Sequence, residues 1–255
     1  MMPLHSKVFG EGFPFIILHG FLGMGDNWKT LGKRFSELGY QLHLVDQRNH
    51  GRSYHTEAFD YELLVSDLKA YCAHYNLEKC VLLGHSMGGK TAMLFAALYP
   101  ELVHKLIIAD IAPRFYPVHH DAILEGLSAL DFTTIKSRAQ ADTQLSSFIP
   151  EFGIRQFLLK NLYWISPGQL DLRLNLKALK NNVSEVGEAL PSHLKIEIPT
   201  LFLKGDKSEY IGQEDEKQIS AQFPNAQVVT ISNAGHWLHA ENPKDFYAAV
   251  TYFLD

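Results

Sequence analysis

Ser86 is the residue of this chain best suited to nucleophilic chemistry. It is the centre of a Gly84-x-Ser86-x-Gly88 segment that follows the apolar run 80–83 and precedes strong helix formers up to Pro100. This order predicts a buried parallel strand that feeds a helix through a sharp turn, with the serine at the helix N-terminus. The free amides and the dipole at that end favour developing negative charge. The pentapeptide alone also fits an ordinary glycine-rich turn, so the remaining chain must decide.

A serine hydroxyl is a poor nucleophile until a base lies within hydrogen-bond reach. We expect His236 to be that base, because it follows a late predicted strand, is flanked by Gly235 and comes after the serine near the end of the chain. A buried histidine satisfied by a backbone carbonyl is the alternative, and it should describe most of the 13 histidines. Together Ser86 and His236 are candidates for a nucleophile and its base.

Predicted strands and helices alternate along much of the chain. Apolar runs predict strands at 4–9, 13–18, 41–45, 80–83, 106–109, 200–204 and 227–231, and helical spacing predicts helices at 27–38, 61–75, 90–98, 214–223 and 243–254. The first two strands are expected to form a hairpin through the glycines at 10 and 12. Alternation of this kind is typical of an α/β fold with a mostly parallel, doubly wound sheet.

Residues 114–190 break the alternation. They contain helical stretches at 121–130, 135–148, 153–164 and 171–182, without a convincing strand. A helical block inserted between two strands predicts a lid over the carboxyl edge of the sheet. The expected division is therefore a core of residues 1–113 and 191–255, with a helical cap at 114–190.

Composition limits the class of protein. The 255 residues are 46% hydrophobic and carry a net charge of −5, enough apolar surface for one large domain and no basic footprint for nucleic acid or anionic membrane. No secretory signal is visible, and no apolar run approaches the roughly 18 residues of a membrane span. Cys72 and Cys80 suggest reduced thiols of the cytoplasm. The spacing of His119-His120 and of His236-x-x-His239 fits no familiar metal site, and we expect no metal, no cofactor and a monomer or small homo-oligomer.

Ligands of open α/β sheets bind beyond the carboxyl ends of the strands, and six polar or glycine-rich segments follow predicted strands here. Four of them carry a family resemblance: His19-Gly20-Phe21-Leu22-Gly23, Asp46-Gln47-Arg48-Asn49-His50-Gly51-Arg52-Ser53, Gly84-His85-Ser86-Met87-Gly88-Gly89 and Ala234-Gly235-His236-Trp237. Over nearly its whole length the chain resembles the α/β-hydrolase superfamily, and its Arg-Asn-His-Gly form resembles the YbfF-type esterase branch. The resemblance implies an α/β-hydrolase fold and hydrolysis of carboxylic esters or thioesters.

The acid partner of the histidine is less obvious. Relatives often carry it two residues after the aspartate of a Gly-Asp-x-Asp turn, where this chain has Ser208. The resemblance therefore implies Asp110, at the end of the strand after the serine helix, with Ser208 bonding the His236–Asp110 pair as a fourth member. Asp206 stays an alternative acid, and Asp110 is also a natural turn cap.

Two backbone amides are expected to form the oxyanion hole, those of Met87 and Phe21. Leu22, Trp28 and Trp237 are expected to line the acyl pocket. Asp46, Arg48 and His50 are interpreted as scaffold, with an Arg–carboxylate pair pinning the loops beside the serine.

The leading hypothesis is a serine hydrolase of carboxylic esters or thioesters with small to medium acyl chains, acyl-CoA included. Its acyl-enzyme forms on Ser86, with His236 as general base. The alternatives are a carbon–carbon bond hydrolase or perhydrolase on the same triad, and a non-catalytic ligand-binding protein of the same fold.

Overall fold

A seven-stranded sheet forms the centre of the molecule, with the strand order β1-β3-β2-β4-β5-β8-β9. In this computed structural model, which describes residues 3–255, each neighbouring pair of strands is parallel except β1 with β3. The predicted α/β fold with a mostly parallel sheet is confirmed. The strands are β1 (Ser6–Phe9), β2 (Phe13–Leu18), β3 (Tyr40–Val45), β4 (Cys80–His85), β5 (Val103–Ala109), β8 (Thr200–Gly205) and β9 (Ala226–Ile231).

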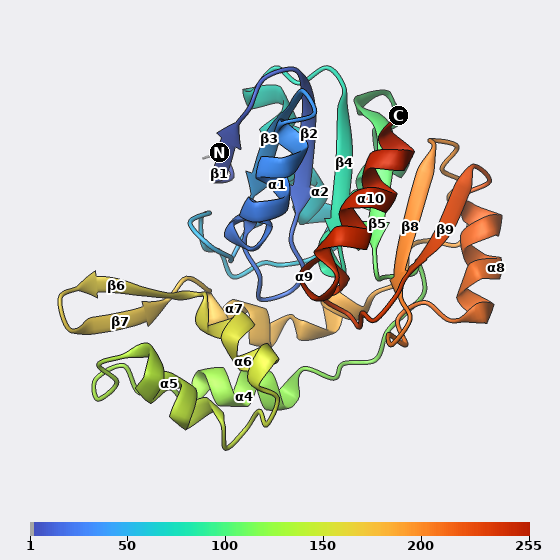
Figure 1. Cartoon of the computed structure of the whole chain (residues 1–255). Coiled ribbons are helices and arrows are strands. Elements are labelled where there is room, and N and C mark those ends of the chain that lie inside the picture. The colour runs from blue at the N-terminus through green and yellow to red at the C-terminus, as the bar shows by residue number, and fades with distance from the viewer. Residues whose placement is uncertain (1–2) are drawn as a thin grey trace.

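Helices cover both faces of the sheet, which explains why its central strands are apolar throughout (Figure 1). Ile16 and Leu18 of β2 pack toward one helical layer, whereas Phe15 and Ile17 pack toward the other. The first layer holds α2 (Tyr61–His74), α3 (Met87–Leu98) and α8 (Gln213–Gln222), and the second holds α1 (Lys29–Ser36), α9 (Leu238–Glu241) and α10 (Pro243–Leu254). Short 3₁₀ helices are η1 (Gly25–Trp28), η2 (Pro100–Leu102) and η3 (Val183–Gly187).

The hairpin predicted for the first two strands is wrong. β1 pairs antiparallel with β3, so that Ser6 lies opposite Val45. Both edges of β2 are occupied by parallel neighbours, β3 and β4. The fully buried run of β2 is typical of such an interior strand, and β1 is left with the outer edge of β3.

The segment between β5 and β8 lies beyond the end of the sheet (Figure 1). It contains α4 (Asp121–Ser128), α5 (Arg138–Leu145), α6 (Phe152–Leu159) and α7 (Leu176–Asn181), together with an antiparallel hairpin of β6 (Leu162–Ser166) and β7 (Gln169–Leu172). The hairpin corrects the expectation that this segment has no strand. Tyr163, Trp164 and Ile165 favour strands, and Pro167-Gly168, with Gly168 at φ 81°, supplies the turn.

The helical insertion packs against the loop after β2 and the start of α3, close to Ser86. Leu124, Leu145 and Leu158 share one apolar cluster with Phe21 and Met87. The division into core and cap stays a prediction. Within residues 3–255, no helix has the length and apolar character needed to cross a bilayer.

A buried lysine of α3 holds both ends of the insertion. The fully buried Lys90 ammonium donates to the carbonyl of Arg114, at 2.6 Å, where the chain leaves the sheet. It also donates to the carbonyls of Gly187, at 3.1 Å, and Glu188, where the chain returns. Burial lowers the pKa of Lys90 to about 7, although the nearby Glu188 opposes this shift. The helix that begins after Ser86 is therefore bonded directly to both ends of the insertion.

Candidate active site

Ser86 lies at the tight turn between β4 and α3, with φ 52° and ψ −120°. This is a strained conformation for a residue other than glycine. The strand and helix approach so closely that a Cβ on Gly84 would lie 2.2 Å from the Gly88 carbonyl, and one on Gly88 would lie 2.5 Å from the His19 carbonyl. Both positions therefore require glycine, and the turn presents the Ser86 hydroxyl beyond the end of the strand.

Residues from three strand ends meet at the hydroxyl. The Ser86 hydroxyl lies 3.0 Å from His236 Nε2, and His236 Nδ1 lies 2.8 Å from Asp110 Oδ2. His236 follows β9, and Asp110 follows β5 and is completely buried. Serine and histidine, 150 residues apart in sequence, thus meet in the geometry that activation of a serine by a histidine requires.

Asp110, rather than Asp206, contacts the histidine. Its Oδ2 also accepts a hydrogen bond from the Ser208 hydroxyl, and its Oδ1 accepts one from the Gly205 amide at 3.1 Å. Asp206 instead accepts hydrogen bonds from the amides of Asn233 and Ala234 at 2.9 and 3.0 Å, and these amides lower its pKa. Asp206 therefore shapes the loop that leads to His236.

Phe21 lies in a turn next to the serine, in which the Gly23 amide donates to the Gly20 carbonyl at 3.0 Å. The amide of Leu22, a residue with φ 59°, donates to His50 Nε2 at 3.2 Å. His50 Nδ1 donates in turn to the Arg48 carbonyl at 2.8 Å. Burial lowers the pKa of His50 to about 3, which keeps its ring neutral, with one donor and one acceptor nitrogen. A neutral histidine thus supports the strained loop of Phe21.

His19 is a second neutral support at the same edge. Its Nδ1 donates to the Gly20 carbonyl at 2.8 Å, and its Nε2 accepts from the Gln47 amide at 3.0 Å. Burial lowers the pKa of His19 to about 4. The Gln47 side chain bridges further, from the His19 carbonyl to the Thr91 hydroxyl of α3. The loops after β2 and β3 are therefore joined to the serine helix.

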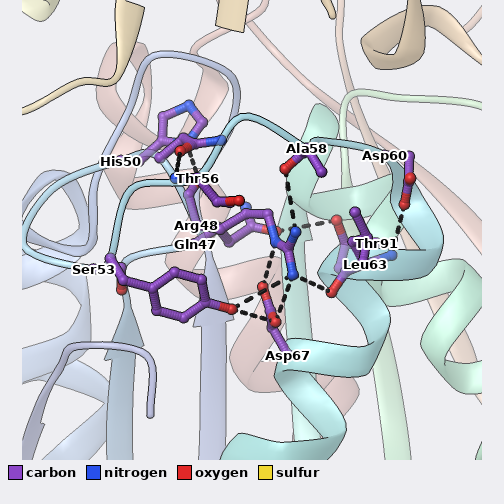
Figure 2. A network of polar contacts seen from close by, with 12 residues as sticks. Gln47, Arg48, His50, Ser53, Thr56, Ala58, Asp60, Leu63, Asp67 and Thr91 are labelled. Carbon is purple, nitrogen blue, oxygen red and sulfur yellow. Dashed lines mark hydrogen bonds and ion pairs between the residues drawn. The ribbon is translucent and has the colours of Figure 1, made fainter. Parts of the chain in front are cut away.

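The expected Arg–carboxylate pair is present, and its carboxylate is Asp67 of α2 (Figure 2). Arg48 Nε lies 2.6 Å from Asp67 Oδ2 and Nη2 lies 2.8 Å from Oδ1, a bidentate pair with both side chains buried. The guanidinium also donates to the carbonyls of Ala58 and Leu63. Asp46 instead accepts from the amides of Gly25 and Arg52.

A cavity of about 330 Å³ opens at Ser86. Leu22 and Trp237 line it together with Ile123, Ile154, Phe157 and Leu158 of the insertion, and their contact with an acyl group stays a prediction. The prediction for Trp28 is wrong. Its ring is 1% exposed and stacks on His239 at 4.0 Å between centroids, in the layer of α1 and α10. As part of η1, Trp28 is directed into the core beneath the site.

Sequence patterns did not point to Tyr210, whose ring stacks on the His236 imidazole. The two centroids lie 3.8 Å apart and the planes are within 15° of parallel. The Tyr210 hydroxyl donates to His119 Nε2 at 2.7 Å, and the Tyr210 amide donates to the Ser208 hydroxyl at 3.3 Å. A single loop after β8 thus contacts both the imidazole and, through Ser208, the Asp110 carboxylate.

Other histidines surround His236 without adding charge. Burial lowers the pKa of His120 to about 4 and that of His239 to about 3, and it also lowers the pKa of His85. His85 Nε2 donates to the backbone carbonyl of His236 at 2.8 Å. These neutral rings do not oppose an imidazolium that forms on His236. Residues 3–255 contain no group of three or more histidine, cysteine or acidic side chains arranged to hold a metal ion.

Comparison with known proteins gives the family. Residues 14–148 match the family described as the alpha/beta hydrolase fold. The chain is 41% identical to a putative esterase/lipase of Haemophilus influenzae over 94% of its own length and 82% of that protein's length. It is 31% identical to esterase YbfF of Escherichia coli, with 95% and 93% covered. A solved structure, titled marine microorganism esterase, is 40% identical with a TM-score of 0.95, and the match covers 99% of this chain and 100% of that one. The predicted resemblance is confirmed, and the chain belongs to the α/β-hydrolase family.

Proposed function

We propose that this protein is a carboxylic ester hydrolase that works through an acyl-enzyme on Ser86. The observation that carries the proposal is the hydrogen-bonded series from the Ser86 hydroxyl through His236 to the buried Asp110, with contacts of 3.0 and 2.8 Å. The two relatives and the solved structure described above carry the word esterase in their names, which supports the same activity.

In the proposed mechanism, His236 Nε2 accepts the hydroxyl proton while Ser86 attacks the ester carbonyl. Asp110 fixes the tautomer of His236 and stabilises its imidazolium, and Ser208 orients Asp110. The amides of Phe21 and Met87 stabilise the oxyanion, each by roughly 3–4 kcal/mol. His236 then protonates the leaving group, and an activated water molecule releases the acyl group from Ser86.

The proposed substrates are small esters or thioesters, acyl-CoA included, with small to medium acyl chains. The mostly apolar lining of the cavity beside Ser86, with Leu22 and Trp237, supports an apolar substrate. Cys72 and Cys80 are buried free thiols, which fits the proposed cytoplasmic location. The net charge of −5 gives no reason to expect a nucleic-acid partner, and a monomer or small homo-oligomer remains the proposed state.

The test combines turnover with labelling. We expect the protein to hydrolyse p-nitrophenyl esters with a burst of p-nitrophenol. We also expect a p-nitrophenyl phosphonate to lose p-nitrophenol and to leave its phosphonyl group, detected by mass, on the peptide that contains Ser86. Ser86→Ala should lose both properties. Ser220→Ala, at an exposed serine of α8, is the matched control and should keep both. A folded protein that turns over no ester and no acyl-CoA would refute the proposal.

A further inference from the structure

Two hollows of very different size meet at Ser86. The large cavity, of about 330 Å³, is the one described above. The small cavity, of about 20 Å³, lies between Ile111 and the two ends of the insertion, with residues 116–120 on one side and Val183 and Val186 on the other. Both are lined by Ser86, and His119, His120 and Tyr210 are common to their walls. A bound ester therefore has two separate places for its two substituents.

The two cavities contact different parts of the site. His236, Trp237 and Phe21 line the large cavity, whereas Met87 and Ile111 line the small one. Phe21 and Met87, whose amides are the proposed oxyanion donors, thus line different cavities. A carbonyl oxygen held between them places the carbonyl carbon at the boundary between the cavities, next to Ser86.

The path of the proton in the reaction determines which cavity takes the leaving group and which takes the acyl group. The bond from Ser86 Oγ to the carbonyl carbon forms, and the Oγ proton moves to His236 Nε2. When the bond to the leaving oxygen or sulfur breaks, the same proton passes from Nε2 to that atom. The leaving atom must therefore lie against His236, on the side of the large cavity. The acyl substituent then extends away from His236, toward Met87.

We propose that the small cavity binds the acyl group and the large cavity binds the alcohol or thiol, so that the enzyme prefers short acyl groups on bulky apolar leaving groups. This inference rests on the proposed function and narrows it. A cavity needs roughly 10–15 Å³ to hold one water molecule, so the small cavity suits the methyl group of an acetyl substituent. Leu22 and Trp237, expected from the sequence to line an acyl pocket, contact the leaving group instead.

Isomeric esters test this assignment directly. Hexyl acetate and ethyl hexanoate contain the same atoms and differ in the side of the ester that carries the chain. We expect kcat/KM, measured by acid release, to be higher for hexyl acetate by about tenfold or more. Equal rates, or faster hydrolysis of ethyl hexanoate, would overturn the assignment. If p-nitrophenyl acetate is not hydrolysed either, the proposed function fails, and the inference fails with it.

Variants in each cavity test which part of the ester that cavity binds, independently of the overall activity. Val186→Ala enlarges the small cavity and should raise kcat/KM for ethyl butyrate relative to ethyl acetate. Ile154→Phe fills part of the large cavity and should lower the ratio of hexyl acetate to ethyl acetate. Ile165→Ala, at the exposed tip of the β6–β7 hairpin, is the control and should alter neither ratio. The opposite pattern, with Ile154→Phe acting on acyl length, would assign the cavities the other way round.

Discussion

Replacement of Asp110 by asparagine tests the core of the proposed mechanism, because the two side chains have nearly the same shape. The Asp110 carboxylate accepts three hydrogen bonds, from His236, Ser208 and Gly205. An amide group offers one acceptor oxygen and two donor hydrogens. An NH₂ group at the Oδ2 position would face His236 Nδ1 and favour the tautomer with the proton on Nε2. That tautomer cannot accept the Ser86 proton.

We expect Asp110→Asn to lower kcat by about 10⁴-fold, which corresponds to about 5.4 kcal/mol of transition-state stabilisation. Asp206→Asn is the matched control. Its remaining oxygen still accepts a hydrogen bond from the loop before His236, and it does not contact the imidazole. We expect a change of about tenfold or less for this control.

The assay is single-turnover and steady-state hydrolysis of p-nitrophenyl acetate, with thermal unfolding of both variants to show that they fold. Active-site titration of the burst then reports the fraction of competent enzyme. A loss of kcat below about 100-fold in Asp110→Asn would refute the assignment of the acid. Catalysis would then need the shape of the side chain at position 110 but not its negative charge. A larger loss in Asp206→Asn than in Asp110→Asn would make Asp206 the acid.

Variants at three further positions test the supports of the site. Ser208→Ala removes a hydrogen bond to a buried charge. It should raise the activation free energy of the reaction or lower the free energy of unfolding by roughly 1–3 kcal/mol, measured by kinetics and denaturant titration. Tyr210→Leu removes the aromatic face against His236 and should lower kcat about 2- to 30-fold, whereas Tyr210→Phe should retain most activity. Lys90 has a pKa of about 7 when folded against 10.5 in its unfolded reference, so the unfolded chain binds the extra proton. The stability of wild type relative to Lys90→Met should therefore rise by roughly 3 kcal/mol from pH 7 to 9.5, and a flat difference would contradict the burial argument.

The buried strands and the serine turn could be predicted because short-range sequence patterns determine them. The apolar runs of β2, β4 and β5 are continuous because helices cover both faces of the sheet. The positions of these strands therefore follow from the local run of apolar residues alone. The glycines at 84 and 88 are likewise a local steric requirement of one turn. Since parallel strands end at one edge, Ser86 and the residues after β5 and β9 were expected together, and the structure brings them into contact.

Features set by distant partners were not predictable in this way. The 4–9 segment has the same pattern whether it pairs with β2 or β3, and only the occupied edges of β2 decide. Trp28 is aromatic and near the site in sequence, but its direction depends on the packing of α10. Asp67 resembles any acidic residue of a surface helix until its pairing with Arg48 is seen. Tyr210 has no pattern at all, because it belongs to an irregular loop.

The Arg-Asn-His-Gly form, the most telling part of the resemblance, is best explained through the backbone rather than through its own chemistry. Asp67 fixes the Arg48 guanidinium, and the Arg48 carbonyl accepts a hydrogen bond from His50 Nδ1. The other ring nitrogen of His50 accepts a hydrogen bond from the Leu22 amide. The left-handed conformation of Leu22 costs about 1–3 kcal/mol and persists only where its surroundings impose it. The position of the Phe21 amide, which is the proposed oxyanion donor, thus depends on a carboxylate of α2. Removal of the Asp67 carboxylate should therefore weaken catalysis, although Asp67 does not contact the substrate.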